Sequence, residues 1–189
     1  MKTPALSDPL PRDLDDDPFD NTSFNYTSVV GMCMYLCNNS RPDLAFAVNQ
    51  CSRHSHRPTM KNAEYLKRVG HYLLTTTRDE GMIFSPSNSL KMDCFYVDAN
   101  FAGLYGHEHE QDPHCIKSSR SGFNIFIGCK ILWSSKLQSK MACSTMEAEY
   151  IACSTACQDL LPLIDLLVHE VATAVNLPID EVTDLRSTI

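Results

Sequence analysis

Two hydrophobic periods follow one another along this chain, and the change between them near Gly81 limits its possible folds most strongly. Before Gly81, apolar residues recur at helical spacing in segments 25–37, 40–54 and 58–77. After it, segments 81–85 and 90–98 alternate as strands do, and 121–136 has the pattern of two strands joined by a tight turn at 128–130. A long helical pattern then covers 142–175, and 178–189 resembles the opening of another strand. We therefore predict an α+β chain, with a three-helix module at 25–80 followed by a three-stranded antiparallel sheet, a long helix and the start of a fourth strand.

Each expected helix has an apolar stripe that should face a core. The stripes are Val29, Cys33 and Leu36; Leu44, Ala47, Val48 and Cys51; Ala63, Leu66, Val69 and Leu73; and Ala148, Ala152, Ala156, Leu160, Leu163 and Leu167. Thr59 is a candidate cap for the third helix. Pro162 should kink or restart the last one, because proline cannot donate the helical hydrogen bond.

The charge distribution bears on possible partners. The net charge is −7, but residues 1–22 carry six acids against Lys2 and Arg12, which predicts a disordered acidic lead-in over residues 1–24. Segments 41–78 and 113–141 each have a balance of +5. Such stretches are compatible with contact to nucleic-acid phosphates, and solvated surface lysines explain them equally well. The candidate contacts are Lys61, Lys67, Arg68, Lys117, Arg120 and Lys136.

Composition also indicates the cellular setting. No run of about 18 apolar residues is present, so we expect no membrane span, and the amino terminus lacks a secretory signal pattern. The nine cysteines are irregularly spaced and include no CxxC pair. We therefore expect an intracellular protein, cytoplasmic or within a virus-like particle, with reduced and buried thiols.

Candidate chemistry begins with Asp98, which ends the strand pattern at 90–98. An acid there is common in turns, and it is also where a metal-binding carboxylate can sit. Glu147 and Glu149 lie in the first turn of the last helix, where Ser144 and Thr145 can cap it, so a structural role alone can explain both acids. A strand-end Asp and a first-turn Glu on a helix that packs over the same sheet can also bring two carboxylates together for Mg²⁺. Only one of the two glutamates can face Asp98, because they point about 200° apart.

Four sequence blocks then suggest a family. "YTSVVGMCMYLCNNSRPDLAFAVNQCSR", "VDANFAG", "KSSRSGFNIFIGCKILWSSKLQ" and "STMEAEYIACSTA" closely resemble copia-type LTR retrotransposon polyproteins. The first block resembles the region that joins the reverse transcriptase to its RNase H domain, and the others resemble the first half of that domain. The resemblance covers about residues 25–185, and the pairing of "VDANFAG" with "STMEAEY" at this separation is its most specific part.

The resemblance implies a function and a site. Family members use an Asp at the end of the first strand, a Glu early in the first helix and further Asp residues to hold two Mg²⁺ ions, which cleave the RNA strand of an RNA–DNA hybrid. These positions fall on Asp98 and Glu147 in this chain, and Glu149 is then a surface or capping acid. The implied partners are an RNA–DNA hybrid or other nucleic acid and the remainder of a reverse transcriptase polyprotein. Trp133 also matches a family position, as a core residue rather than a stacking platform.

Departures from the family pattern leave two hypotheses. The family's next catalytic Asp ends its fourth strand, and this sequence reaches Ile189 where that strand would begin. We therefore expect 81–189 to be an incomplete RNase H-like domain. Nothing in the sequence resembles the catalytic Asp pair of the polymerase. The chain is then either an RNase H-like hydrolase that uses Asp98 and Glu147, or an inactive remnant with weak binding to nucleic-acid backbones, and the incomplete ligand set favours the second.

An insertion after the first strand raises one more question. Segment 104–115 contains His107, His109, His114 and Cys115 within nine residues, all of them capable of binding a metal. Their spacing is not a standard zinc pattern, and acids are interleaved among them. We interpret the segment as a solvated loop.

Overall fold

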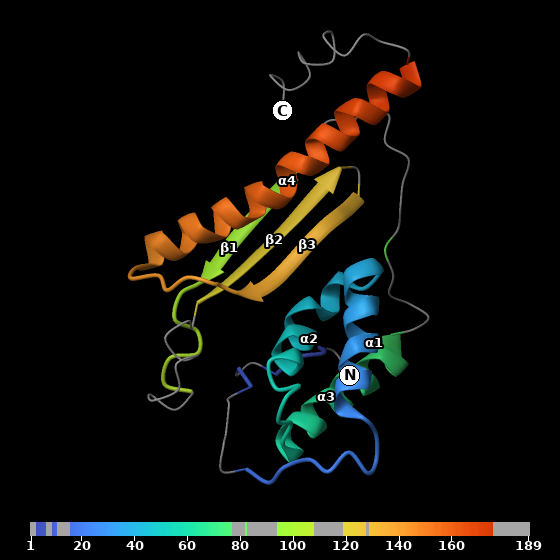
Figure 1. The fold of residues 1–189 in the computed structure, drawn as a ribbon, viewed down its shortest axis with the longest axis vertical. Helices are drawn as coiled ribbons and strands as arrows, with labels where there is room; N and C mark the ends of the chain where they lie inside the picture. Colours follow the sequence, from blue (N-terminus) through green and yellow to red (C-terminus); the bar gives the residue numbers. More distant parts are fainter. Residues whose placement is uncertain are drawn as a thin grey trace.

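The structure is a computed structural model of the chain and describes residues 3–6, 9–10, 16–76, 82, 94–107, 119–127 and 129–175. Its elements are α1 (Tyr26–Asn39), the 3₁₀ helix η1 (Pro42–Leu44), α2 (Ala45–Ser52), α3 (Met60–Thr76), β1 (Cys94–Asn100), β2 (Arg120–Ile127), β3 (Cys129–Leu137) and α4 (Thr145–Val175). Figure 1 shows the sheet between α4 on one side and the α1–α3 module on the other. The predicted α+β class is confirmed. The strand segments expected at 81–85 and 178–189 lie outside the described residues, apart from Met82.

Local sequence explains where the first helices begin. Asn25 caps α1, because its side-chain oxygen accepts a hydrogen bond from the backbone N–H of Ser28 at 2.9 Å. Thr59 precedes α3, and its Oγ1 accepts from the backbone N–H of Asn62 at 3.4 Å, while Oδ1 of Asn62 accepts from the backbone N–H of Thr59 at 2.8 Å. The expected role of Thr59 at this helix start is therefore confirmed.

The helical module has its own core, and most of the expected stripes line it. All four apolar residues of the second stripe are buried, as are the first three of the third stripe. In α1 the buried face is shifted by one position, since Val30 and Cys37 are buried while Leu36 is 37% exposed. The hydroxyl of Tyr26, which is fully buried, donates to the carbonyl of Cys51 at 2.9 Å and joins α1 to α2.

The described residues of the amino-terminal segment, 3–6, 9–10 and 16–24, include two that pack on the helical module, which was not expected of a lead-in. Leu10 and Phe19 are 7% and 6% exposed and belong to the core of the helical module. The backbone N–H of Phe19 donates to the carbonyl of Pro58 at 2.9 Å, and Pro18 forms an isolated bridge with Thr59. Because acids dominate the composition of this segment, its sequence did not indicate that Leu10 and Phe19 would pack in a core.

The sheet is antiparallel with strand order β1-β2-β3, and β2 and β3 form the predicted hairpin. Val97 pairs with Phe123, and Asp98 pairs with Gly122. The register between β2 and β3 shifts between Ile125 and Phe126. Ile127 pairs with Cys129, so Cys129 and Lys130, which were expected in the turn, belong to β3.

Helix α4 covers one face of the sheet. Ala148, Ala152, Ala156 and Leu160 are buried, as the stripe predicted, and the last two pack with Phe123 and Ile125. The helix continues through Pro162 as one element, so the expected restart does not occur. No helix in the described part of the chain is long and apolar enough to cross a membrane.

Candidate active site

Asp98 lies in β1 with an exposed side chain. Its neighbours Val97 and Phe95 pack against the cluster that contains Ala156 and Leu160 of α4. Because successive side chains of a strand point to opposite faces, Asp98 projects from the face that α4 does not cover. Tyr96 shares that face and contacts the ring of Phe126 edge-on at 6.0 Å between centroids.

Glu147 lies in the first turn of α4, and its carboxylate closes that end of the helix. The backbone N–H of Glu147 donates to Oγ of Ser144 at 3.1 Å, and Oε2 of Glu147 accepts from the backbone N–H of Cys143 at 2.7 Å. Ser144 thus caps the helix, while the Glu147 carboxylate binds the backbone N–H of the residue before the cap, a variant of the capping box that fixes the entry of the chain into α4. The side chain of Glu147 is exposed. Its hydrogen bonds give it a structural role in addition to any chemical one.

Gln138 fixes the start of α4 to the same end of the sheet as Asp98. Its side-chain nitrogen donates to Oγ of Ser121 at 2.9 Å and to the carbonyl of Ala148 at 2.8 Å. Ala148 follows Glu147, and Ser121 pairs with Ala99, which follows Asp98. The two candidate carboxylates therefore lie at the same end of the sheet, on different sides of it.

This arrangement bears on the expected magnesium ion. Two exposed carboxylates are suitable donors for a hard divalent cation. They do not point to a common position, however, because Asp98 projects away from α4 and one oxygen of Glu147 already accepts from Cys143. Among the described residues, no group of three or more His, Cys, Asp or Glu side chains could hold a metal ion. A magnesium site that uses both carboxylates therefore stays a prediction.

Comparison with known proteins decides the family. Over 145 residues the chain is 35% identical to the retrovirus-related Pol polyprotein from transposon RE2 of Arabidopsis thaliana, and over 136 residues it is 37% identical to that from transposon TNT 1-94 of Nicotiana tabacum. These matches cover 76% and 72% of this chain. A third relative, the secreted RxLR effector protein 161 of Plasmopara viticola, is 38% identical over 136 residues, and the match covers 87% of that protein. The chain belongs to the family of copia-type retrotransposon Pol polyproteins.

The similarity covers only a small part of the polyprotein relatives. The chain spans about 9% of the length of these two polyproteins. No family model matches the sequence, and no solved structure matches the fold. The chain is therefore a retrotransposon-derived polyprotein segment, and the comparisons carry no assignment of single residues.

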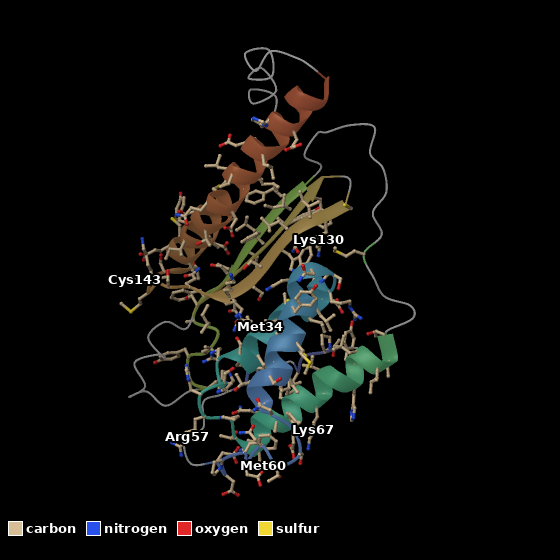
Figure 2. All side chains as sticks on the ribbon, turned by 45° about the vertical axis from the view of Figure 1, so that its right-hand side comes forward. Met34, Arg57, Met60, Lys67, Lys130 and Cys143 are labelled. Atoms are coloured by element: carbon tan, nitrogen blue, oxygen red, sulfur yellow. The ribbon has the colours of Figure 1, made fainter. Side chains whose placement is uncertain are left out.

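The residues expected to contact nucleic acid lie on different parts of the chain. Lys61 lies 3.8 Å from Oδ1 of Asp16, and Lys67 lies over the ring of Phe24 at 5.9 Å. Figure 2 places Lys67 on the helical module, well away from Lys130 beside the hairpin. Lys67 of stretch 41–78 and Lys130 of stretch 113–141 therefore do not belong to one basic patch.

The remaining candidates lie in different settings. Arg68 of α3 donates to the carbonyl of Thr3 at 3.4 Å, and Lys136 of β3 is exposed. Lys117 lies outside the described residues. Arg120 differs from the expectation of a surface contact, because it is only 7% exposed.

The loop residues weighed as zinc ligands fall mostly outside the described chain. His107 is described and exposed, whereas His109, His114 and Cys115 are not described. The expectation of a solvated loop at 104–115 therefore stays a prediction.

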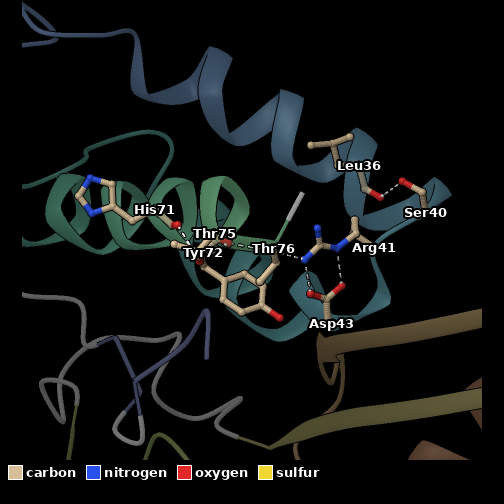
Figure 3. Close-up of polar contacts among 8 residues, drawn as sticks. All are labelled: Leu36, Ser40, Arg41, Asp43, His71, Tyr72, Thr75 and Thr76. Atoms are coloured by element: carbon tan, nitrogen blue, oxygen red, sulfur yellow. Dashed lines mark hydrogen bonds and ion pairs between the residues drawn. The ribbon is translucent and has the colours of Figure 1, made fainter. Parts of the chain in front are cut away.

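Sequence reasoning missed a polar network in the helical module. The Nε and Nη2 atoms of Arg41 donate to both carboxylate oxygens of Asp43, at 2.9 and 2.7 Å, and Nη2 also donates to Oγ1 of Thr76 at 2.8 Å (Figure 3). Burial pushes the pKa of Asp43 upward, but hydrogen bonds from Arg41 and Tyr72 outweigh it and hold that pKa below its ordinary value. The network joins the start of η1 to the end of α3. A basic residue two positions before an acid beside a proline was its only sequence signal.

Proposed function

We propose that this chain is the RNase H-like segment of a copia-type Pol polyprotein, joined to a helical connection module. By this proposal Asp98 and Glu147 are the carboxylates that such a domain contributes to hydrolysis of the RNA strand of an RNA–DNA hybrid. Support comes from the order of the elements: an antiparallel sheet is followed by a helix whose first turn Gln138 binds beside the end of β1. The polyprotein relatives fit the same assignment.

We further propose that the chain alone does not cleave such hybrids. The observation that carries this part is the bond of the Glu147 carboxylate to the backbone N–H of Cys143, while Asp98 projects from the opposite face. A change that turned Glu147 toward Asp98 would release the N–H of Cys143 to solvent and weaken the start of α4. The role of the chain is then to supply fold and weak contacts to nucleic-acid backbones within a larger assembly. The exposed Lys61, Lys67 and Lys136 are its candidate contacts.

A cleavage assay tests whether the chain alone is inactive. The 189-residue chain and its Asp98→Asn variant are incubated with a labelled RNA–DNA hybrid in Mg²⁺, and a complete RNase H serves as a positive control for the substrate. We expect no cleavage by the chain above the level of the variant. Robust Mg²⁺-dependent cleavage that Asp98→Asn abolishes would show that the chain is an active hydrolase. Binding to the hybrid, measured by fluorescence anisotropy, should weaken steeply with salt if lysines contact phosphates.

A further inference from the structure

Arg120, the first residue of β2, has a buried guanidinium that is only partly satisfied. The side chain is 7% exposed. Its Nη1 donates to Oδ1 of Asn49 and lies 3.5 Å from the carbonyl of Ser135, and the ring of Phe46 lies 5.0 Å from the guanidinium carbon. Its Nη2 is buried and has no hydrogen-bond partner among the residues that the structure describes. A donor left in this state costs free energy that a bound acceptor would recover.

The charge of Arg120 is also uncompensated within the part of the chain that the structure describes. No described carboxylate forms an ion pair with it, and the only cation that affects its pKa among the described residues, Arg53, opposes its charge, while Tyr65 offsets part of that effect. Burial, with a smaller contribution from Arg53, lowers the pKa of Arg120 to about 10, so the group stays positive at neutral pH. A buried cation without a partner is strongly destabilising, which makes an anion the missing component.

A cavity of about 60 Å³ adjoins this side chain. Its wall includes Arg120, Phe46, Gln50, Asn100, Leu104 and Pro9. A water sphere occupies about 10–15 Å³, so the space has room for a small ion together with water.

The polar groups of the cavity are mainly donors. Gln50 is 1% exposed, and its Oε1 accepts from Nη1 of Arg53 at 3.2 Å, which leaves its amide nitrogen as the free end. The carboxamide of Asn100 lies against Gly103, where a Cβ atom would come within 2.5 Å of its nitrogen. The absence of a side chain at Gly103 therefore makes room for this amide. Apolar residues form the other walls, an environment that favours a small ion of low charge.

We propose that this cavity is a binding site for a small monovalent anion, with chloride as the physiological ligand, held by Nη2 of Arg120 and the amides of Gln50 and Asn100. The site lies where three parts of the chain meet: Phe46 and Gln50 come from α2, Arg120 and Asn100 from the sheet, and Pro9 from the amino-terminal segment. The anion thus stabilises the contact between the helical module and the sheet. The inference does not depend on hybrid cleavage.

Thermal unfolding tests the proposal on the whole chain. Chloride is varied at constant ionic strength against gluconate, which is too large for the cavity. Chloride at about ten times its dissociation constant should raise the Tm by about 4 °C, because it binds only the folded state. Arg120→Met should abolish this dependence, whereas Lys140→Gln, which removes an exposed cation, should retain it. Equal stabilisation by gluconate and chloride would overturn the proposal.

A second measurement covers the case in which Arg120→Met fails to fold. The ³⁵Cl NMR line of a chloride solution should broaden in the presence of the native chain and narrow again as bromide competes for the site. Asn100→Leu keeps Arg120, fills the cavity with carbon and should remove the broadening while far-UV circular dichroism stays unchanged. No saturable broadening with the native chain would mean that water fills the cavity, and this would refute the anion site.

Discussion

Trp133 of β3 donates its indole N–H to the backbone carbonyl of Cys37 in α1 at 2.8 Å, a contact between residues 96 positions apart. It is a direct bond between the sheet and the helical module, on the face opposite α4. Trp133 was expected to be a core residue, and the structure shows it half-buried with its polar atom satisfied. This pairing is typical of tryptophan, which buries a ring and places its N–H on an acceptor.

Trp133→Phe should destabilise the chain because it leaves the Cys37 carbonyl without this donor. We expect a loss of about 1–2 kcal/mol in the free energy of unfolding. Urea titration followed by circular dichroism at 222 nm measures it, since the variant lacks the chain's single tryptophan. Tyr150→Phe, at an aromatic side chain that is 70% exposed, is the matched control. Equal unfolding midpoints for both variants would contradict the bond's role.

Asp43→Asn should weaken the chain at neutral pH and lose that effect in acid. The folded-state pKa of Asp43 lies below its ordinary value, so the carboxylate stabilises the fold above about pH 4 and this stabilisation is lost as the pH falls through the lowered pKa. We expect the variant to be about 1–2 kcal/mol less stable at pH 7, with a difference that shrinks progressively as the pH falls below about 4. Urea midpoints at pH 7, 5 and 3 measure the difference. Asp159→Asn, an exposed acid on α4, should show no such convergence.

Substitutions at Glu147 separate its structural role from any catalytic one. Glu147→Ala removes the acceptor of the Cys143 N–H and should cost about 1 kcal/mol of stability. Glu147→Gln keeps an oxygen at that position and should retain most of the capping energy. Differential scanning calorimetry of both variants, with Glu149→Ala as the exposed neighbour, measures these effects. If the Gln and Ala variants are equally destabilised, the capping role is wrong.

Thiol reactivity should divide the described cysteines into two groups. Burial raises the pKa of Cys33 and Cys37 and raises that of Cys51 to about 12, which suppresses the reactive thiolate. Cys143 and Cys153 are exposed. Timed alkylation with mass spectrometry at pH 8 should label the exposed pair at least about 100-fold faster than Cys51, because only the thiolate reacts. In urea the rates should converge, and fast labelling of Cys51 in the native chain would argue against the buried core.

The helices and the hairpin could be predicted because their signals are local. The stripe that includes Leu44 and Cys51 follows the helical period, and Gly128 lies between the two strand patterns. The packing of Leu10 and Phe19 could not be predicted, because two apolar residues among many acids give no periodic signal. Their burial depends on the apolar core that only the folded module provides.

The local setting of the candidate residues was predictable from the sequence, but the direction in which they point was not. The capping pattern that places Ser144 three positions before Glu147 can be read directly from the sequence, and the structure contains it. The alternation along β1 is equally clear, but which face of the sheet α4 covers depends on tertiary packing. The same limit applies to Arg120, since a positive charge in a sequence does not reveal whether it is buried. Only the structure shows that Asn49, from a distant helix, contacts it.

The bridge between Pro18 and Thr59 affects how this chain can be shortened. A recombinant version that starts at Asn25 would strip Phe19 and Leu10 from the helices they cover and open that core to water. Such a product should bind hydrophobic dyes and aggregate, although every helix is intact in its sequence. Expression boundaries for this segment should therefore lie upstream of Leu10.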